Sequence, residues 1–162
     1  MNTKNRGQSS KWFWPVLFFI LLMAAAVLSY QFRDYFEPKV IASLQYDPTC
    51  NLRQSACRLT LPDGGEVEFS ITPDTIPVLQ PVQFHVAVSG TNVSAVEVDL
   101  VGTNMNMGYN RPALKSKGNN TFSGETVIPV CVRNRMDWEA RVLLHTPRGI
   151  VMAPFRFYTL KK

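Results

Sequence analysis

Short apolar runs with a period of two recur along this chain from residue 40 onward, and they restrict its fold more than any other feature. In one run, Val82, Phe84, Val86 and Val88 alternate with residues that are polar or small, which places His85 opposite the apolar side chains. Successive side chains of an extended chain point to opposite faces, so this alternation predicts a strand that is buried on one face.

Similar runs follow one another between turns that are rich in Pro, Gly and Asn. They cover 40–46, 58–61, 66–71, 82–88, 95–101, 121–132, 138–145 and 151–158. Pro62 to Gly65 forms a hairpin turn signal between two of them. About eight short strands with no amphipathic helical stretch among them predict an all-β domain, an antiparallel β-sandwich of immunoglobulin-like type.

An uncharged apolar segment, Trp12–Tyr30, precedes these runs. About 20 consecutive apolar residues suffice to cross a membrane as a helix, so the segment predicts one N-terminal transmembrane helix. A cleaved signal peptide is the alternative, because Lys4, Arg6 and Lys11 resemble its basic region and Met23–Ala26 offers small residues for cleavage.

Positive charge sets the predicted orientation, because Lys4, Arg6 and Lys11 precede the segment without any acidic residue. We expect a single-pass protein of the bacterial inner membrane with its N-terminus in the cytoplasm. The expected parts are a cytoplasmic tail (1–11), a transmembrane helix (12–30), a connector (31–39) and a periplasmic β-sandwich domain (40–162).

The charge of the remaining chain excludes one class of partner. The formal net charge of the whole chain is +5, but every acidic residue lies beyond Tyr30, where fourteen basic residues face twelve acidic ones. This near balance forms no basic patch, so we expect no nucleic-acid partner.

Three cysteines fit an oxidising compartment with one bonded pair and one cysteine left over. Cys50 and Cys57 flank a short polar loop whose ends can meet, and we expect a disulfide between them. The alternatives are two reduced thiols or a metal site, although the spacing matches no common zinc pattern. Cys131 is then unpaired, either as a small buried residue or as a thiolate ligand.

Two methionines stand two residues apart in the loop that follows the strand 95–101. Met105 and Met107 point the same way if the loop is extended. Thioethers are soft, uncharged ligands that favour Cu(I) over hard cations, so the pair is a candidate Cu(I) site. The alternative is packing or partner contact, to which methionine is equally suited.

Further donors would have to come from elsewhere in the fold. We consider Met136 and Cys131 the best additional metal ligands, and His85, His145 and Met152 complete the pool. Tyr109, next to the methionines, is a candidate partner contact. The chain lacks a nucleophile elbow, a zinc-hydrolase helix and a Cys-x-x-Cys motif, and we therefore expect no enzymatic activity.

The second half of the chain resembles the YtkA-like and FixH-like group of membrane-tethered β-sandwich domains. The resemblance covers about residues 81–158 and rests on MNMG at 105–108, TFSG at 121–124 and MDWEA at 136–140. It implies an accessory protein that handles copper for delivery to, or assembly of, a respiratory oxidase, with that oxidase or a copper-delivery protein as partner. A non-metal interaction module that uses the Met and Tyr loop as an apolar contact is the alternative.

Overall fold

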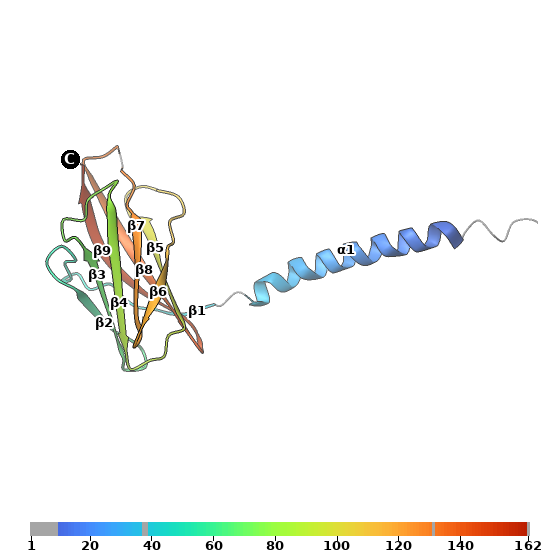
Figure 1. Cartoon of the computed structure of the whole chain (residues 1–162), viewed down its shortest axis with the longest axis horizontal. Helices are drawn as coiled ribbons and strands as arrows, with labels where there is room; N and C mark the ends of the chain where they lie inside the picture. Colours follow the sequence, from blue (N-terminus) through green and yellow to red (C-terminus); the bar gives the residue numbers. More distant parts are fainter. Residues whose placement is uncertain (1–9, 37–38, 131, 162) are drawn as a thin grey trace, which may run out of the picture. The chain divides into compact units, whose positions relative to one another are not determined.

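The computed structural model describes residues 10–36, 39–130 and 132–161, which divide into a helical unit up to residue 38 and a β unit from Lys39 onward (Figure 1). The helical unit contains α1 (Ser10–Phe36). The strands are β1 (Val40–Ser43), β2 (Cys57–Thr60), β3 (Glu66–Thr72), β4 (Pro81–Ser89), β5 (Ala95–Gly102), β6 (Ala113–Gly118), β7 (Thr121–Val127), β8 (Arg135–Thr146) and β9 (Gly149–Leu160).

Helix α1 corrects the predicted localisation. A membrane span needs about 20 consecutive apolar residues, and within the described part of the chain no helix is long and apolar enough to meet this requirement. The described helix therefore does not support a single-pass inner-membrane protein anchored through residues 12–30, nor the cytoplasmic and periplasmic sides assigned from it. Residues 1–9 of the predicted tail lie outside the described residues.

In the described residues, nine strands form one sheet in the order β1-β9-β8-β5-β6-β7-β4-β3-β2. Strand β1 pairs with β9 in parallel, and the other neighbours are antiparallel. Phe69 on β3 and Phe155 on β9 stand near opposite ends of this order, yet their ring centroids are 5.2 Å apart. The sheet is therefore curled, and its two halves pack against each other.

The predicted alternation is confirmed by the burial of the strands. On β4, the four apolar side chains from Val82 to Val88 are buried and His85 is exposed. Trp138 on β8 is fully buried, and its Nε1 donates a hydrogen bond of 3.0 Å to Oγ1 of Thr159. The expectation of a mostly β domain is confirmed, while its immunoglobulin-like arrangement stays a prediction.

Strand β6 is the element that the sequence did not reveal. The runs identified in the sequence leave residues 102–120 without a strand, but Ala113–Gly118 pairs with β5 on one side and with β7 on the other. Leu114 is the only side chain of β6 that is buried, so the strand has almost no apolar pattern. The turn between β6 and β7 is made by Asn119 and Asn120, whose φ angles of 50° and 53° lie in the left-handed region that Asn tolerates.

A disulfide joins Cys50 and Cys57, as predicted, with their Cα atoms 5.6 Å apart. Cys57 is the first residue of β2 and belongs to the buried core, whereas Cys50 lies in the preceding loop. The bond thus fastens that loop to the β2 edge of the sheet. Cys131 lies outside the described residues, so its predicted free thiol stays a prediction.

Replacing both bonded cysteines by alanine should destabilise the β unit. Closing an eight-residue loop restricts the unfolded chain, which predicts a loss of about 2–3 kcal/mol in the free energy of unfolding. Urea denaturation followed by circular dichroism measures this difference, with Cys131→Ala as the matched control. If the double cysteine variant lost no more free energy of unfolding than Cys131→Ala, the prediction would be contradicted.

Glu139 on β8 predicts a pH dependence of stability. Burial raises the pKa of its carboxyl, but hydrogen bonds from Arg141 (2.8 Å) and Arg156 (3.1 Å) outweigh this effect and hold the pKa below its ordinary value of 4.5. The folded protein therefore takes up the proton at lower pH than the unfolded chain. The stabilisation is complete above the unfolded pKa and is lost as the pH falls through the folded pKa.

We expect Glu139→Gln to be less stable than the parent near neutral pH and to lose less stability on acidification. Thermal unfolding measured from pH 6 to pH 3 tests this, within the range of about pH 5 and below over which a carboxylate of lowered pKa acts. The exposed Glu66→Gln serves as control. Parallel pH profiles for Glu139→Gln and the parent would show that the two arginines do not stabilise the fold through this carboxylate.

Candidate functional site

The methionine loop, residues 103–112, connects β5 to β6. Met105 and Met107 are half-buried and pack against the core, while Asn106 between them is exposed. The two thioethers therefore lie on the inner side of the loop. This is the shared orientation that the two-residue spacing predicts for an extended segment.

Gly102, the last residue of β5, marks the point where the methionines meet. A Cβ atom built on Gly102 would collide with the carbonyl oxygen of Met105 and the methyl group of Met136, and would lie 3.1 Å from Cγ of Met107. Met136 is 2% exposed and belongs to the core. The structure thus brings Met107 and Met136 together, with Met105 in the same loop, whereas Cys131 lies outside the described residues.

The pairing register of β5 and β8 explains why Met107 and Met136 lie close together. Strands β5 and β8 are antiparallel neighbours, and Gly102 stands opposite Trp138. The end of β5 and the beginning of β8 therefore lie at the same edge of the sheet. A loop that leaves β5 there must pass beside Met136, the second residue of β8.

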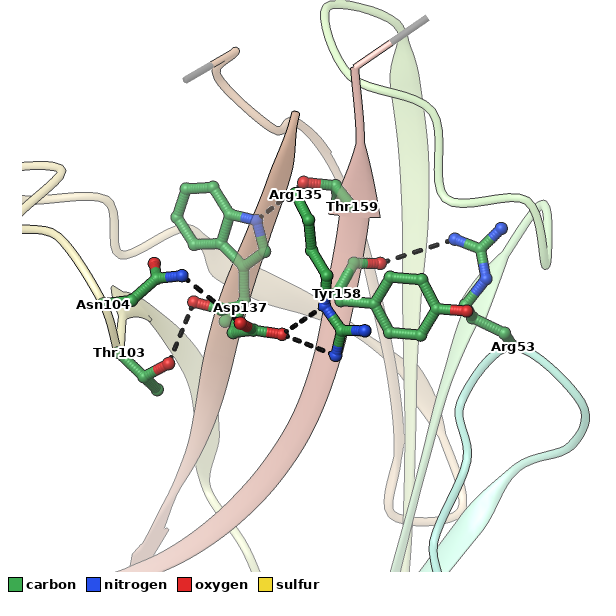
Figure 2. A network of polar contacts seen from close by, with 8 residues as sticks. Arg53, Thr103, Asn104, Arg135, Asp137, Tyr158 and Thr159 are labelled. Atoms are coloured by element: carbon green, nitrogen blue, oxygen red, sulfur yellow. Dashed lines mark hydrogen bonds and ion pairs between the residues drawn. The ribbon is translucent and has the colours of Figure 1, made fainter. Parts of the chain in front are cut away.

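Asp137 fixes the start of the methionine loop (Figure 2). Its backbone carbonyl accepts hydrogen bonds from the amide of Thr103 (3.0 Å) and from the Thr103 hydroxyl (3.2 Å). Its carboxylate accepts one from Nδ2 of Asn104 (3.2 Å) and forms an ion pair with Arg135. The sequence did not predict that Asp137 holds the loop. An Asp next to a buried Met on a strand cannot be distinguished, from the sequence, from any other residue of the outward face.

Beside this anchor, Arg135 lies over the ring of Tyr158, at 4.2 Å from the centroid. Arg53 lies 5.0 Å from the same centroid and donates a 3.4 Å hydrogen bond to the Tyr158 carbonyl. Figure 2 shows the two guanidinium groups with Tyr158 between them. Arg135 and Asp137 also line a hollow of about 610 Å³ that extends to the disulfide loop. The anchor of the methionine loop is therefore part of a larger polar network.

Tyr109, the predicted partner contact, is 81% exposed. The guanidinium of Arg111 lies 5.3 Å from its ring centroid and is paired with Asp99 at 3.2 Å. The phenol ring thus projects from the methionine loop with one cation beside it. An exposed aromatic of this kind is available to a partner.

The remaining donors of the predicted pool lie elsewhere. His85 is exposed on β4, Met152 is on β9, and His145 on β8 faces Glu97 with Nε2 3.7 Å from the carboxylate. Among the described residues, no three or more His, Cys, Asp and Glu side chains are grouped to hold a metal ion.

Comparison with known proteins identifies no family for this chain. No protein-family model matches the chain, and a search of curated proteins finds no significant relative. The resemblance to YtkA-like and FixH-like domains therefore stays a prediction.

Gly102→Ala should disturb the methionine loop. The new methyl group would collide with backbone at Met105, which cannot rotate away as a flexible side chain can. We expect a destabilisation of about 1–3 kcal/mol, typical of an overpacked position, together with altered NMR signals of the Met105 and Met107 methyl groups. The exposed Lys115→Ala on β6 is the control, and a Gly102→Ala variant as stable as this control would contradict the described packing.

Proposed function

We propose that the β unit is a copper-handling accessory module that binds Cu(I) through the thioethers of Met105, Met107 and Met136. The approach of Met107 and Met136 beside Gly102, with Met105 on the inner side of the same loop, supports this proposal. Cys131 is the fourth candidate from the sequence. We further propose that the module is a binding protein and not an enzyme.

The chemistry of the three side chains selects the ion. Thioethers carry no charge and are soft, so they bind Cu(I) far better than Zn²⁺, Mg²⁺ or Ca²⁺. Met136 is buried and the loop methionines are half-buried, which leaves an ion bound there in contact with apolar surroundings. Release to an acceptor would occur on the loop side, where the two half-buried methionines lie closer to solvent than Met136.

The proposed acceptor of the copper is another protein. The resemblance to YtkA-like and FixH-like domains suggests a respiratory oxidase or a copper-delivery protein. It also suggests the immunoglobulin-like arrangement of the β unit. The contact between the two halves of the curled sheet, at Phe69 and Phe155, is compatible with two sheets that face each other.

An interaction module is the second candidate function, and the exposure of Tyr109 favours it. In this alternative the half-buried methionines support the loop, and Tyr109 with Arg111 contacts a partner protein. Aromatic and Arg side chains are the commonest energetic centres of protein interfaces. Leucine would then replace both loop methionines with little loss, because its size and polarity are similar.

Titration of the full-length chain with Cu(I) under anaerobic, reducing conditions tests the proposal. Competition with a chromophoric Cu(I) chelator gives the affinity for the parent and for Met105→Leu/Met107→Leu. Loss of an outer-shell partner alone costs about 10–100-fold in metal affinity, so loss of two ligands should weaken binding at least about 100-fold. Met136→Leu should weaken it as well.

Met152→Leu is the matched control, because Met152 lies on β9 and pairs with β1 and β8 away from the methionine loop. It should bind Cu(I) like the parent. Unchanged binding in the double leucine variant would overturn the copper site. If that variant also kept its partners while Tyr109→Ala lost them, the interaction module would replace the copper function.

A further inference from the structure

A second hollow of about 710 Å³ lies away from the methionine loop, between the segment 73–80 and the end of β9. Hydrogen bonds fix its walls: the amide of Leu79 donates to the carbonyl of Ile128 (2.9 Å), and Lys161 donates to that of Asn134 (2.8 Å). Its volume is in the range of ligand pockets, about 300–1,000 Å³. The hollow is thus built from fixed backbone and is large enough for a small molecule.

Apolar side chains line most of this hollow, and several of them remain exposed. Leu79 is 64% exposed, Leu160 49% and Val130 39%, although each lines the same depression. Pro77 and Val78 complete the apolar wall beside the buried Ile76. Exposed apolar side chains that converge on one concavity are typical of a binding groove.

The backbone of segment 73–80 is strained at two of the apolar residues that line the groove. Ile76 and Leu79 have φ angles of 43° and 58°, in the left-handed region that bulky side chains rarely adopt. Ile76 faces the core and is 1% exposed, whereas Leu79 points outward at the groove. The strained backbone therefore directs an apolar side chain away from the core, toward solvent.

Among the described residues that line the groove, the charged groups are two cations. Arg53 and Lys161 contribute them, and none of the described lining residues carries a carboxylate. Nη1 of Arg53 donates to the carbonyl of Thr75 (2.9 Å), which fixes the guanidinium at the rim. The same Nη1 donates to the carbonyl of Tyr158, and the hydrogen bonds of Arg53 to described residues use neither Nε nor Nη2, so these donors remain for an anion. Asp74 belongs to the same segment but does not line the groove.

We propose that this groove binds a small amphiphile that carries one carboxylate and an unbranched apolar chain, a medium-chain fatty acid in chemical class. The carboxylate pairs with the guanidinium of Arg53 and the ammonium of Lys161, since charge-assisted hydrogen bonds to carboxylates are among the strongest available. The chain lies along Leu79, Val130 and Leu160 and covers their exposed surface. None of the three methionines of the proposed copper site lines this groove.

Isothermal titration of the full-length chain with decanoate, below its micelle concentration, tests the proposal, with decyltrimethylammonium as a probe of equal chain length and opposite charge. We expect saturable binding of one decanoate per chain, and affinity at least about tenfold lower for the cation, because the two side-chain charges attract one and repel the other. Equal affinity for both probes would overturn the assignment.

Two variants locate the site. Leu79→Asn removes the apolar side chain while keeping a residue that tolerates the left-handed conformation, and Lys161→Met removes one charge. Each should weaken decanoate binding about tenfold, as loss of one charged or one large apolar contact does. Lys117→Met, on β6, is the control and should bind like the parent.

Thermal unfolding establishes that the variants are folded. Folded Leu79→Asn and Lys161→Met chains that bind decanoate like the parent would overturn the proposal. They would show that decanoate associates with other apolar surface, such as the exposed side chains of α1.

Discussion

The contact between the two halves of the curled sheet is the interaction on which the rest of the β unit depends. A single flat sheet of alternating strands would leave its apolar face in water, because the β unit has no helix of its own among its described residues to cover that face. Curling places the rings of Phe69 and Phe155 in contact and buries Trp138 completely. Each large side chain buried in this way contributes about 1.5–3 kcal/mol.

The curl also determines where loops can meet. Because β6 pairs with both β5 and β7, it carries the chain from one half of the sheet to the other, and the methionine loop is the connection that enters it. The beginning of β8 lies beside the end of β5, so Met136 reaches the same place as Met107 although the two are distant in sequence. The candidate site is thus a consequence of strand order.

The sequence allowed prediction of those features that depend on local pattern. Alternation placed most strands and the exposed side of His85, and loop length placed the disulfide at Cys50 and Cys57. Strand β6 escaped because its pairing comes from its neighbours, with Leu114 as its one buried side chain. The membrane anchor was wrong for a different reason: the apolar segment Trp12–Tyr30 lies in α1, but no helix of the described residues is long and apolar enough for a span.

Within the candidate site, too, only the features that depend on local sequence pattern could be predicted. The shared side of Met105 and Met107 follows from their spacing, but the approach of Met136 depends on strand order, which no local pattern contains. The role of Asp137 could not be predicted for the same reason, because Asp137 is on β8 and its partners Thr103 and Asn104 are in the methionine loop, which is distant in sequence.

Met136 and Asp137 lie on opposite faces of β8 and contribute to the candidate site in different ways. Met136 points inward and offers a soft sulfur to the core side of the loop, while Asp137 points outward and holds the loop in place. Both carboxylate oxygens of Asp137 are engaged, Oδ1 by Arg135 and Oδ2 by Asn104. A hard divalent cation would have to displace a guanidinium to use this carboxylate, whereas Cu(I) needs only the thioethers on the other face. The alternation of one strand therefore places the residue that fixes the loop and the residue proposed as a Cu(I) ligand on opposite faces of β8.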